Sequence, residues 1–377
     1  MSTVVVTGAS GFVGQRVVSL LARSGSAGRV VGIDLVPPAD VGLATEPGVV
    51  EHRIIDLARD PAERLVAVLD GVDCVLHLAW SHAQPSASTA RHQPGTSSNL
   101  RSLRRVLDAA DHAGIRTLVH VSSSTVYGAW PDNPVPLPED APLRPNPGFS
   151  FAIEKAEAER LIAEWTEDHP GAAVAILRPA VTVGATTVIG SAGPVLYQAL
   201  AGTRGPRPDD GGRPLQFLHV DDLAAAAVMA WERRLRGIYN VAPDGWITED
   251  EARALAGGVA RVTLPGRLVR LVATVGWDLL RTGIPKEALP YSVHPWVVAN
   301  DRLRTAGWAA EYSNEEALVK SDERSHWGDL PPSRRQEIAL VAAGAALIAT
   351  AGTVVAGVAA VAGKARRAHR QRVTTTG

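Results

Sequence analysis

The sequence predicts an α/β protein with a doubly wound parallel sheet and a hydrophobic helix at the C-terminus. Three observations predict this fold class. Short apolar runs alternate with amphipathic stretches up to residue 177, a pattern typical of a parallel sheet covered by helices on both faces. A glycine-rich segment at residues 7–14 joins the first apolar run to the first amphipathic stretch. Residues 338–363 contain no charged side chain.

The individual elements follow from this alternation. Strands are predicted at residues 3–7, 29–34, 49–55, 73–78, 117–122 and 173–177. Helices are predicted at residues 12–24, 62–69, 100–113 and 154–167. The proline-rich stretch 131–147 is predicted to be a loop between a strand end and a helix, where functional residues are common.

The composition is that of a packed globular protein, because 46% of the 377 residues are hydrophobic and 20% are charged. The formal net charge of −1 excludes the overall basic field of a nucleic-acid-binding protein. A single cysteine, Cys74, excludes an intramolecular disulfide framework and a cysteine-cluster metal site. His77 and His219 show no metal-ligand spacing with acidic residues, so no metal site is predicted. The N-terminus does not resemble a signal peptide, and a cytosolic body is expected.

Residues 7–14 read Thr-Gly-Ala-Ser-Gly-Phe-Val-Gly. The first glycine permits a tight turn, the second lets the backbone approach a pyrophosphate, and the third allows close packing of helix on strand. The helix N-terminus adds N–H donors and positive potential. The segment therefore predicts a dinucleotide site with contacts from Gly8, Ser10, Gly11, Phe12, Val13 and Gly14.

Asp34 lies 20 residues after Gly14, at the end of the second predicted strand. This spacing suits a carboxylate that accepts hydrogen bonds from the adenosine ribose hydroxyls. A 2′-phosphate would meet like charge there, so NAD is predicted in preference to NADP. Asp56 and Leu57 follow the third strand and are expected near the adenine.

Several further motifs recur in a fixed order along the chain. They are His-Leu-Ala-Trp at 77–80, Asn-Leu at 99–100, Val-Ser-Ser-Ser-Thr-Val-Tyr-Gly at 121–128, Leu-Arg-Pro at 177–179, Phe-Leu-His-Val-Asp-Asp-Leu-Ala at 217–224 and Tyr-Asn-Val at 239–241. With the glycine-rich segment, they resemble the NAD-dependent epimerase/dehydratase family of extended short-chain dehydrogenases/reductases over residues 3–318. The family's motif at 77–80 usually ends in two alanines, where this chain has Trp80.

The resemblance implies a Rossmann lobe at residues 1–178, to which residues 217–242 return, and a smaller C-terminal, mainly substrate-binding lobe at residues 179–320. It implies NAD as cofactor and a small-molecule substrate, often a nucleotide-sugar. A homodimer is compatible with it.

The resemblance also implies roles for single residues. Ser123 stands at the catalytic serine or threonine position, and Lys155 at that of the lysine that bonds the nicotinamide ribose. The alternatives are a serine that caps backbone and a solvated helix lysine. Asn99 is expected either to hold a water or backbone group or to cap the helix. Leu78 and Ala79 are implied at the cofactor.

Phe151 stands where the family has the tyrosine of its Tyr-x-x-x-Lys pair. Phenylalanine cannot take the proton that a carbinol oxygen must lose, and loss of a general base costs about 10²–10⁴-fold in rate. Three interpretations stay open. In the first, Ser150, Ser123 or Glu154 takes the place of the tyrosine as the base. In the second, the reaction needs no such base, and in the third, the protein binds NAD and a ligand without turnover.

The C-terminal region divides into a linker at residues 321–337, a hydrophobic helix at 338–363 and a basic tail at 364–377. The charge-free run is long enough to span a bilayer, which needs about 20 apolar residues. It predicts attachment to the cytoplasmic face of the membrane, and the alternative is an alanine-rich helix packed on the body. A location at the membrane suggests a lipid-linked substrate.

Two functions follow from these observations. The first is an NAD-dependent epimerase/dehydratase-like oxidoreductase that acts on a nucleotide-sugar or another carbinol, with Ser123 and Lys155 in place. The second is a catalytically silent NAD-binding sensor or scaffold at the membrane.

Overall fold

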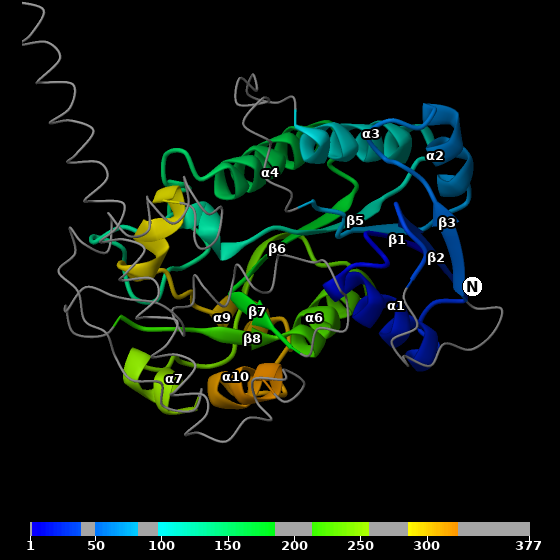
Figure 1. The fold of residues 1–377 in the computed structure, drawn as a ribbon. Helices are drawn as coiled ribbons and strands as arrows, with labels where there is room; N and C mark the ends of the chain where they lie inside the picture. Colours follow the sequence, from blue (N-terminus) through cyan, green and yellow to red (C-terminus); the bar gives the residue numbers. More distant parts are fainter. Residues whose placement is uncertain (1, 39–49, 82–96, 185–212, 256–285, 323–377) are drawn as a thin grey trace, which may run out of the picture.

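The structure is a computed structural model that describes residues 2–38, 50–81, 97–184, 213–255 and 286–322. Within these residues the main sheet has seven parallel strands in the order β3-β2-β1-β4-β5-β6-β9 (Figure 1). They are β1 (Thr3–Thr7), β2 (Arg29–Asp34), β3 (Val50–Ile54), β4 (Cys74–His77), β5 (Thr117–Val121), β6 (Ala173–Pro179) and β9 (Gly237–Val241). The order runs outward from β1 in one direction and from β4 in the other. The predicted doubly wound α/β fold is therefore confirmed.

Helices cover both faces of this sheet (Figure 1). On one face lie α1 (Phe12–Ser24) and α6 (Val220–Glu232), and on the other lie α2 (Ala62–Leu69), α3 (Ser98–His112) and α4 (Ser150–Asp168). Strand side chains alternate between the two faces, yet Val4, Val5 and Val6 of β1 are all fully buried. The double cover explains why the strands read as continuous apolar runs.

Two helices begin earlier than the sequence predicts. α3 begins at Ser98 because the Ser97 hydroxyl caps it, accepting the N–H of Leu100 at 3.2 Å. α4 begins at Ser150, one turn before residue 154, because Phe151 and Ala152 are buried and their burial stabilises the added turn. The two positions of the altered pair, 151 and 155, therefore lie on one helix.

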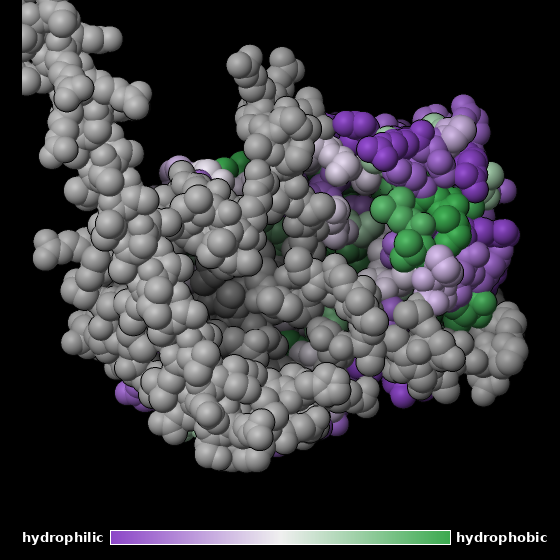
Figure 2. All heavy atoms as spheres, in the orientation of Figure 1, coloured by the Kyte–Doolittle hydropathy of each residue, from purple (hydrophilic) through white to green (hydrophobic). Residues whose placement is uncertain are grey.

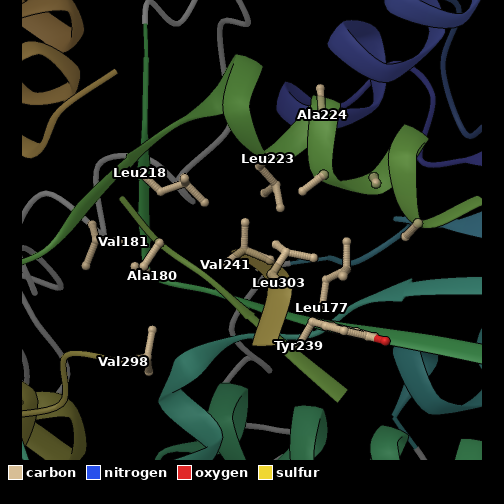
Figure 3. Packing of buried hydrophobic residues seen from close by; sticks show 14 of the residues in the cluster. Leu177, Ala180, Val181, Leu218, Leu223, Ala224, Tyr239, Val241, Val298 and Leu303 are labelled. Atoms are coloured by element: carbon tan, nitrogen blue, oxygen red, sulfur yellow. The ribbon is translucent and has the colours of Figure 1, made fainter. Parts of the chain in front are cut away.

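A second, smaller sheet pairs β7 (Val181–Val183) with β8 (Phe217–His219). The remaining described elements are η2 (Ser124–Tyr127), α7 (Glu249–Leu255), η3 (Lys286–Ser292), α9 (Asp301–Thr305) and α10 (Asn314–Asp322). One apolar cluster joins the two sheets, with Leu177 and Val241 from the main sheet beside Val181 and Leu218 from the small one (Figure 3). The chain on both sides of Pro179 thus shares a core.

The predicted hydrophobic helix at 338–363 and basic tail at 364–377 lie outside the described residues. So does the predicted linker at 321–337, apart from its first two residues, which end α10. In the part of the chain that the structure describes, no helix has the length and apolar character needed to cross a bilayer. The membrane helix therefore stays a prediction from sequence.

Candidate active site

The glycine-rich segment forms the tight turn between β1 and α1. Gly8 has φ of +73°, and a Cβ there would lie 2.7 Å from the backbone nitrogen of Ala79. A Cβ on Gly14 would lie 2.8 Å from the Cα of Ala9 and would overlap the carbonyl oxygen of Gly8. The turn can therefore pack against α1 and the end of β4 only with glycine at both positions.

The start of α1 is built to hold an anion. Gly11 is the N-cap and offers no side chain, and the first turn contains no acidic residue. The N–H groups of Phe12 and Val13, at the first helical positions, have no intrahelical acceptor. A Cβ on Gly11 would meet, among the described atoms, only the Gly8 carbonyl oxygen at 3.1 Å. These features together fit a phosphate group.

Asp34 ends β2 beside this turn. Its Oδ2 accepts the N–H of Ser10 at 2.9 Å, and its Oδ1 accepts the N–H of Leu35 at 2.7 Å. The Ser10 hydroxyl donates to the carbonyl oxygen of Val36 at 2.8 Å. Both Ser10 donors are therefore used inside the protein and hold Asp34, whose carboxylate oxygens keep further lone pairs for a ribose diol.

The turn after β3 borders the same region. The Oδ1 of Asp56 accepts the N–H of Ala58 at 2.9 Å, so the carboxylate caps its own turn, and Leu57 is buried in the core. Figure 2 shows an apolar patch where β2 and β3 lie. The exposed large apolar side chains at the ends of these strands are Leu35, Val36 and Ile54. An adenine ring has apolar faces, so this surface fits one.

Asn99 fixes the chain that follows β4. Its Oδ1 accepts the N–H of Ser81 at 2.8 Å, and its Nδ2 donates to the Ser81 carbonyl oxygen and to Oε2 of Glu154, each at 3.0 Å. Asn99 thus bonds backbone, and the alternative that it caps α3 is wrong because Ser97 is the cap. Just before, the N–H groups of Leu78 and Ala79 donate to the carbonyl oxygen and hydroxyl of Thr7 at 3.1 and 3.3 Å.

Two serines follow β5 at the start of η2. Ser123 is buried, and its Oγ accepts the N–H and the hydroxyl of Thr125 at 3.2 and 2.9 Å. It therefore caps η2, as the structural interpretation predicts, and its own hydroxyl hydrogen remains to be donated. Ser124 has a buried hydroxyl that finds no hydrogen-bond partner among the described residues. It lines a small cavity with Ala180, Val181, Arg213, Leu215 and Trp296.

Lys155 is buried on α4, with only 4% of its surface exposed. Its Nζ donates to the carbonyl oxygen of Val121, at the end of β5, at 2.7 Å. The same nitrogen lies 3.6 Å from the centre of the Trp80 ring. Burial lowers the pKa of Lys155 to about 7, against the opposing effect of Glu159 and Glu154. The interpretation as a solvated helix lysine is therefore wrong.

Phe151 lies one turn before Lys155 and is also buried. Its ring centre is 5.9 Å from that of Phe149, which is 5.1 Å from that of Tyr291. The Tyr291 hydroxyl donates to the carbonyl oxygen of Thr125 at 2.6 Å. An aromatic cluster at the start of α4 thus extends to η2, and the position that resembles the catalytic tyrosine carries no ionisable group.

A buried ion pair supports these elements from behind. The Nη2 of Arg178 in β6 lies 2.6 Å from Oε2 of Glu159 in α4, and both side chains are almost fully buried. Arg178 also donates to the Tyr127 hydroxyl at 2.7 Å, and that hydroxyl donates to Asn240 at 2.7 Å. Burial raises the pKa of Tyr127 to about 12. Tyr127 is therefore a neutral structural residue at neutral pH.

Sequence reasoning did not single out Trp80 or Ser124. The available signal for Trp80 was the departure from the two alanines that usually end the motif at 77–80. Ser124 gave no signal, because nothing in a run of three serines separates them. Their roles differ through the 3₁₀ turn: Ser122 donates to Glu159, Ser123 caps the turn and Ser124 lines the cavity.

Comparisons with known proteins agree with this geometry. A 3-diazoavenalumate denitrifying reductase from a Streptomyces species is 30% identical over 318 residues, covering 81% of this chain and 95% of the relative. A dTDP-glucose 4,6-dehydratase from Streptomyces griseus is 31% identical over 255 residues, covering 65% and 75%. The solved structure of a UDP-glucose 4-epimerase from Thermotoga maritima shares the fold, with a TM-score of 0.63 at 19% identity and coverage of 85% and 97%.

The family model described as NAD dependent epimerase/dehydratase family matches residues 4–242. This range contains the turn, Asp34 and the strand ends described above. The helix N-terminus, the carboxylate and the apolar surface fit the pyrophosphate, ribose and adenine of NAD, which is the cofactor of the family. The chain belongs to the NAD-dependent epimerase/dehydratase family.

Proposed function

We propose that the protein is an NAD-dependent oxidoreductase that acts at a carbinol or carbonyl carbon of a small molecule, without a catalytic tyrosine. One observation carries the proposal. The glycine-rich turn and Asp34 lie at the carboxyl ends of β1 and β2, and Ser123 and the Lys155–Val121 contact lie at the carboxyl end of β5. Ligands of doubly wound sheets bind along this edge, so cofactor and substrate groups meet there.

The residues at this edge of the sheet have separate roles in the proposed reaction. When bound, NAD supplies the hydride acceptor or donor. The N–H groups of Phe12 and Val13 hold its pyrophosphate, and Asp34 accepts the ribose hydroxyls. Ser123 donates its remaining hydroxyl hydrogen to a substrate oxygen, and Lys155 supplies a buried cation beside it.

The missing tyrosine narrows the chemistry. Tyr127 cannot serve as the base, because Arg178 and Asn240 engage its hydroxyl and burial raises its pKa to about 12. Glu154 accepts a hydrogen bond from Asn99, which links it to the chain after β4. The site therefore favours either proton transfer by a residue other than tyrosine or a reaction in which no carbinol oxygen changes its proton.

Two substrate classes follow from the similar proteins. The dehydratase from Streptomyces griseus is named for dTDP-glucose, a nucleotide-sugar. The denitrifying reductase is named for a diazo compound, and a diazo group has no hydroxyl oxygen that a tyrosine would serve. Phe151 is compatible with the second class, whereas a substrate of the first class needs another residue to take up the proton of its carbinol oxygen. Nucleotide-sugars and non-sugar substrates are therefore both tested.

A second candidate function is an NAD-binding sensor or scaffold without turnover. The observation that favours it is that Ser123 caps η2 while Phe151 packs in an aromatic cluster. In that case NAD binding would remain and no substrate would be reduced or oxidised.

The test begins with the full chain. NAD and NADP binding are measured by calorimetry, and nucleotide-sugars and aromatic carbonyl and diazo compounds are then scanned for a change in NADH absorbance. Lys155→Met is expected to lower any turnover at least about 10²-fold, the lower end of the range for a positioned acid or base. Lys320→Met is the matched control, because Lys320 also lies over an aromatic ring, Tyr312, at 4.1 Å. NAD binding without turnover on any compound would favour the sensor.

We propose the cellular location from the sequence alone, because residues 338–377 lie outside the described residues. Residues 338–363 anchor the protein at the cytoplasmic face of the membrane, and the basic tail contacts anionic lipid. Deleting residues 331–377 is then expected to move the protein from the membrane fraction to the supernatant. A full-length protein found wholly in the supernatant would exclude the anchor.

A further inference from the structure

Trp80 and Lys155 form a contact that none of the sequence motifs predicts. Trp80 follows β4 and Lys155 lies on α4, and the ammonium nitrogen is 3.6 Å from the centre of the indole ring. A cation this close to an aromatic face is attracted by the negative charge density of the ring. The carbonyl oxygen of Val121 holds the same nitrogen from another side at 2.7 Å. The ammonium is therefore fixed by one group that follows β4 and by another at the end of β5.

The orientation of the indole supports a role for its face. A buried indole N–H usually finds an acceptor. The Nε1 of Trp80 is buried and has no hydrogen-bond partner within the described residues. The edge contact with His120, at 6.3 Å between ring centres, and the ammonium of Lys155 are the polar contacts of this ring that the structure describes. The ring thus presents its face to Lys155, while its N–H has no acceptor in the part of the chain that the structure describes.

The titratable groups around Lys155 are two histidines and two glutamates, and Lys155 is buried among them. His77 from β4 and His120 from β5 face it, and burial together with the Lys155 charge lowers the pKa of both imidazoles. Glu154 and Glu159 face it from α4 itself. Glu159 is bonded to Arg178 and Glu154 to Asn99. Neither carboxylate therefore forms a direct hydrogen-bonded pair with the ammonium in the described structure.

We infer that Trp80 is a positioning residue that holds Lys155 at the end of β5, and that Lys155, so held, exchanges the proton of the substrate oxygen. The inference rests on the proposed function and deepens it. The geometry supports it, because the bond from Lys155 to the Val121 carbonyl oxygen lies at the carboxyl end of β5, two residues before Ser123. The pKa of about 7 that burial gives Lys155 agrees with this role, because an amine with that pKa exists in both forms at neutral pH. Phe151, one turn away, offers no competing group.

The step balances as a proton transfer coupled to the redox reaction of the cofactor. In the oxidation of a carbinol, the neutral amine of Lys155 forms an N–H bond with the carbinol proton while the O–H bond breaks. The carbinol carbon loses a hydride with its electron pair to NAD and becomes a carbonyl. The ammonium then releases the proton to solvent. Reduction runs the same transfers in reverse.

The direct test is a titration of Lys155 in the full chain without cofactor. The sequence contains only four lysines, Lys155, Lys286, Lys320 and Lys364, so labelling lysine with ¹³C at Cε gives four resolvable signals by NMR. The Lys155→Arg variant identifies its signal by absence. We expect the wild-type Lys155 signal to titrate with a midpoint near 7.

Variants at position 80 test the role of the ring. Trp80→Phe keeps an aromatic face, and the midpoint is expected to stay within about one pH unit of the wild type. Trp80→Ala removes the attraction of the ring for the ammonium, which alone would lower the midpoint, and also admits water. Because burial is the largest cause of the low pKa of Lys155, the midpoint is expected to rise toward the ordinary value of about 10.4. The pH profile of turnover should move in the same direction. Trp165→Ala is the matched control, because Trp165 lies on α4, the helix of Lys155, and its buried N–H likewise has no partner among the described residues.

The outcomes separate the inference from the proposed function. A wild-type Lys155 midpoint above about 9.5, or a Trp80→Ala midpoint equal to the wild type, overturns the inference even when turnover is found. An inactive protein whose Lys155 titrates near 7 and responds to Trp80→Ala supports the positioning role and overturns the proposed function. If Trp80→Ala does not fold, the wild-type and Trp80→Phe titrations still decide.

Discussion

Asp34 and Ser10 are joined by a hydrogen bond from the Ser10 backbone N–H to the Asp34 carboxylate, with 2.9 Å between nitrogen and oxygen. The bond connects the end of β2 to the glycine-rich turn, 24 residues earlier in the chain. It fixes a negative charge beside the N-terminus of α1. A phosphate on the ribose 2′-oxygen would bring a second negative charge to the same place, so the pair favours NAD over NADP.

Asp34→Ala is therefore expected to weaken NAD more than NADP, because only the NAD complex loses hydrogen bonds to the ribose hydroxyls. Asp34→Asn keeps an acceptor for Ser10 and serves as the control for folding. Calorimetric titration of the three proteins with both cofactors provides the measurement. Equal affinity of the unmodified protein for NAD and NADP would contradict the assignment.

Gly14 and Gly11 should respond differently to alanine. Gly14→Ala places a Cβ on the Gly8 carbonyl oxygen, a backbone atom that cannot move away, so the protein is expected to lose stability. Gly11→Ala meets the same oxygen at 3.1 Å and projects toward the phosphate position, so the fold is expected to persist while NAD affinity falls. Thermal unfolding and NAD titration distinguish the two effects. Equal losses of stability in both variants would contradict the different roles assigned to Gly11 and Gly14.

The buried pair of Glu159 and Arg178 should contribute much more than a surface pair on the same helix. Glu159→Gln leaves the Arg178 charge buried without its partner, at an expected cost of about 3–5 kcal/mol in the free energy of unfolding. Glu157→Gln removes the partner of Arg160, whose side chain is 52% exposed, at an expected cost of about 0–1 kcal/mol. Urea unfolding measures the free energy of unfolding of both variants. Similar losses in the two variants would show that the buried pair contributes no more to stability than the surface pair.

His120 should make the protein sensitive to acid. Burial lowers its pKa well below the ordinary value, so below pH of about 6.5 the unfolded chain takes up a proton that the folded chain does not. Stability then falls as pH decreases through that range, by up to about 1.4 kcal/mol per pH unit. His120→Leu should reduce this slope and not remove it, because burial also lowers the pKa of the neighbouring His77, to about 3.

His169 is the control with the opposite sign. The carbonyl oxygen of Trp165 and the carboxylate of Asp111 raise its pKa. Its stabilising effect is therefore full below pH of about 6.5 and lost as pH rises through the raised pKa. His169→Gln should lower stability on the acid side only. Denaturation midpoints are measured from pH 5 to pH 8 for His120→Leu, His169→Gln and the wild type. Curves of both variants that run parallel to the wild-type curve would contradict the opposite pKa shifts of the two histidines.

Phe151→Tyr tests whether the altered site retains the geometry of a Tyr-x-x-x-Lys pair. Residues 151 and 155 lie one turn apart on α4, so the added hydroxyl comes near a buried lysine that can lower its pKa. Turnover on a carbinol substrate is expected to rise about 10²-fold, the usual size of a general-base contribution. A variant that is inactive and less stable by about 1–3 kcal/mol would instead mean that the hydroxyl is buried without a partner.

The sequence by itself determined six of the seven strands of the main sheet, the glycine-rich turn and the position of Asp34. Each of these depends on residues close together in the chain: apolar runs of strand length, glycines three residues apart and a carboxylate at a strand end. Steric and hydrogen-bonding rules act over such short spans without knowledge of the rest of the molecule. This is also why Phe151 could be recognised as a departure before any contact was known.

The tertiary structure alone decided what surrounds these residues. Trp80 meets Lys155 because β4 and β5 are neighbours in the sheet and α4 packs over their ends. The Tyr127 hydroxyl reaches Asn240, 113 residues later, because β9 pairs with β6. The pKa of Lys155 and the pairing of Arg178 with Glu159 depend on how completely water is excluded there. Burial and strand order arise from the packing of the whole chain, so no local pattern encodes them.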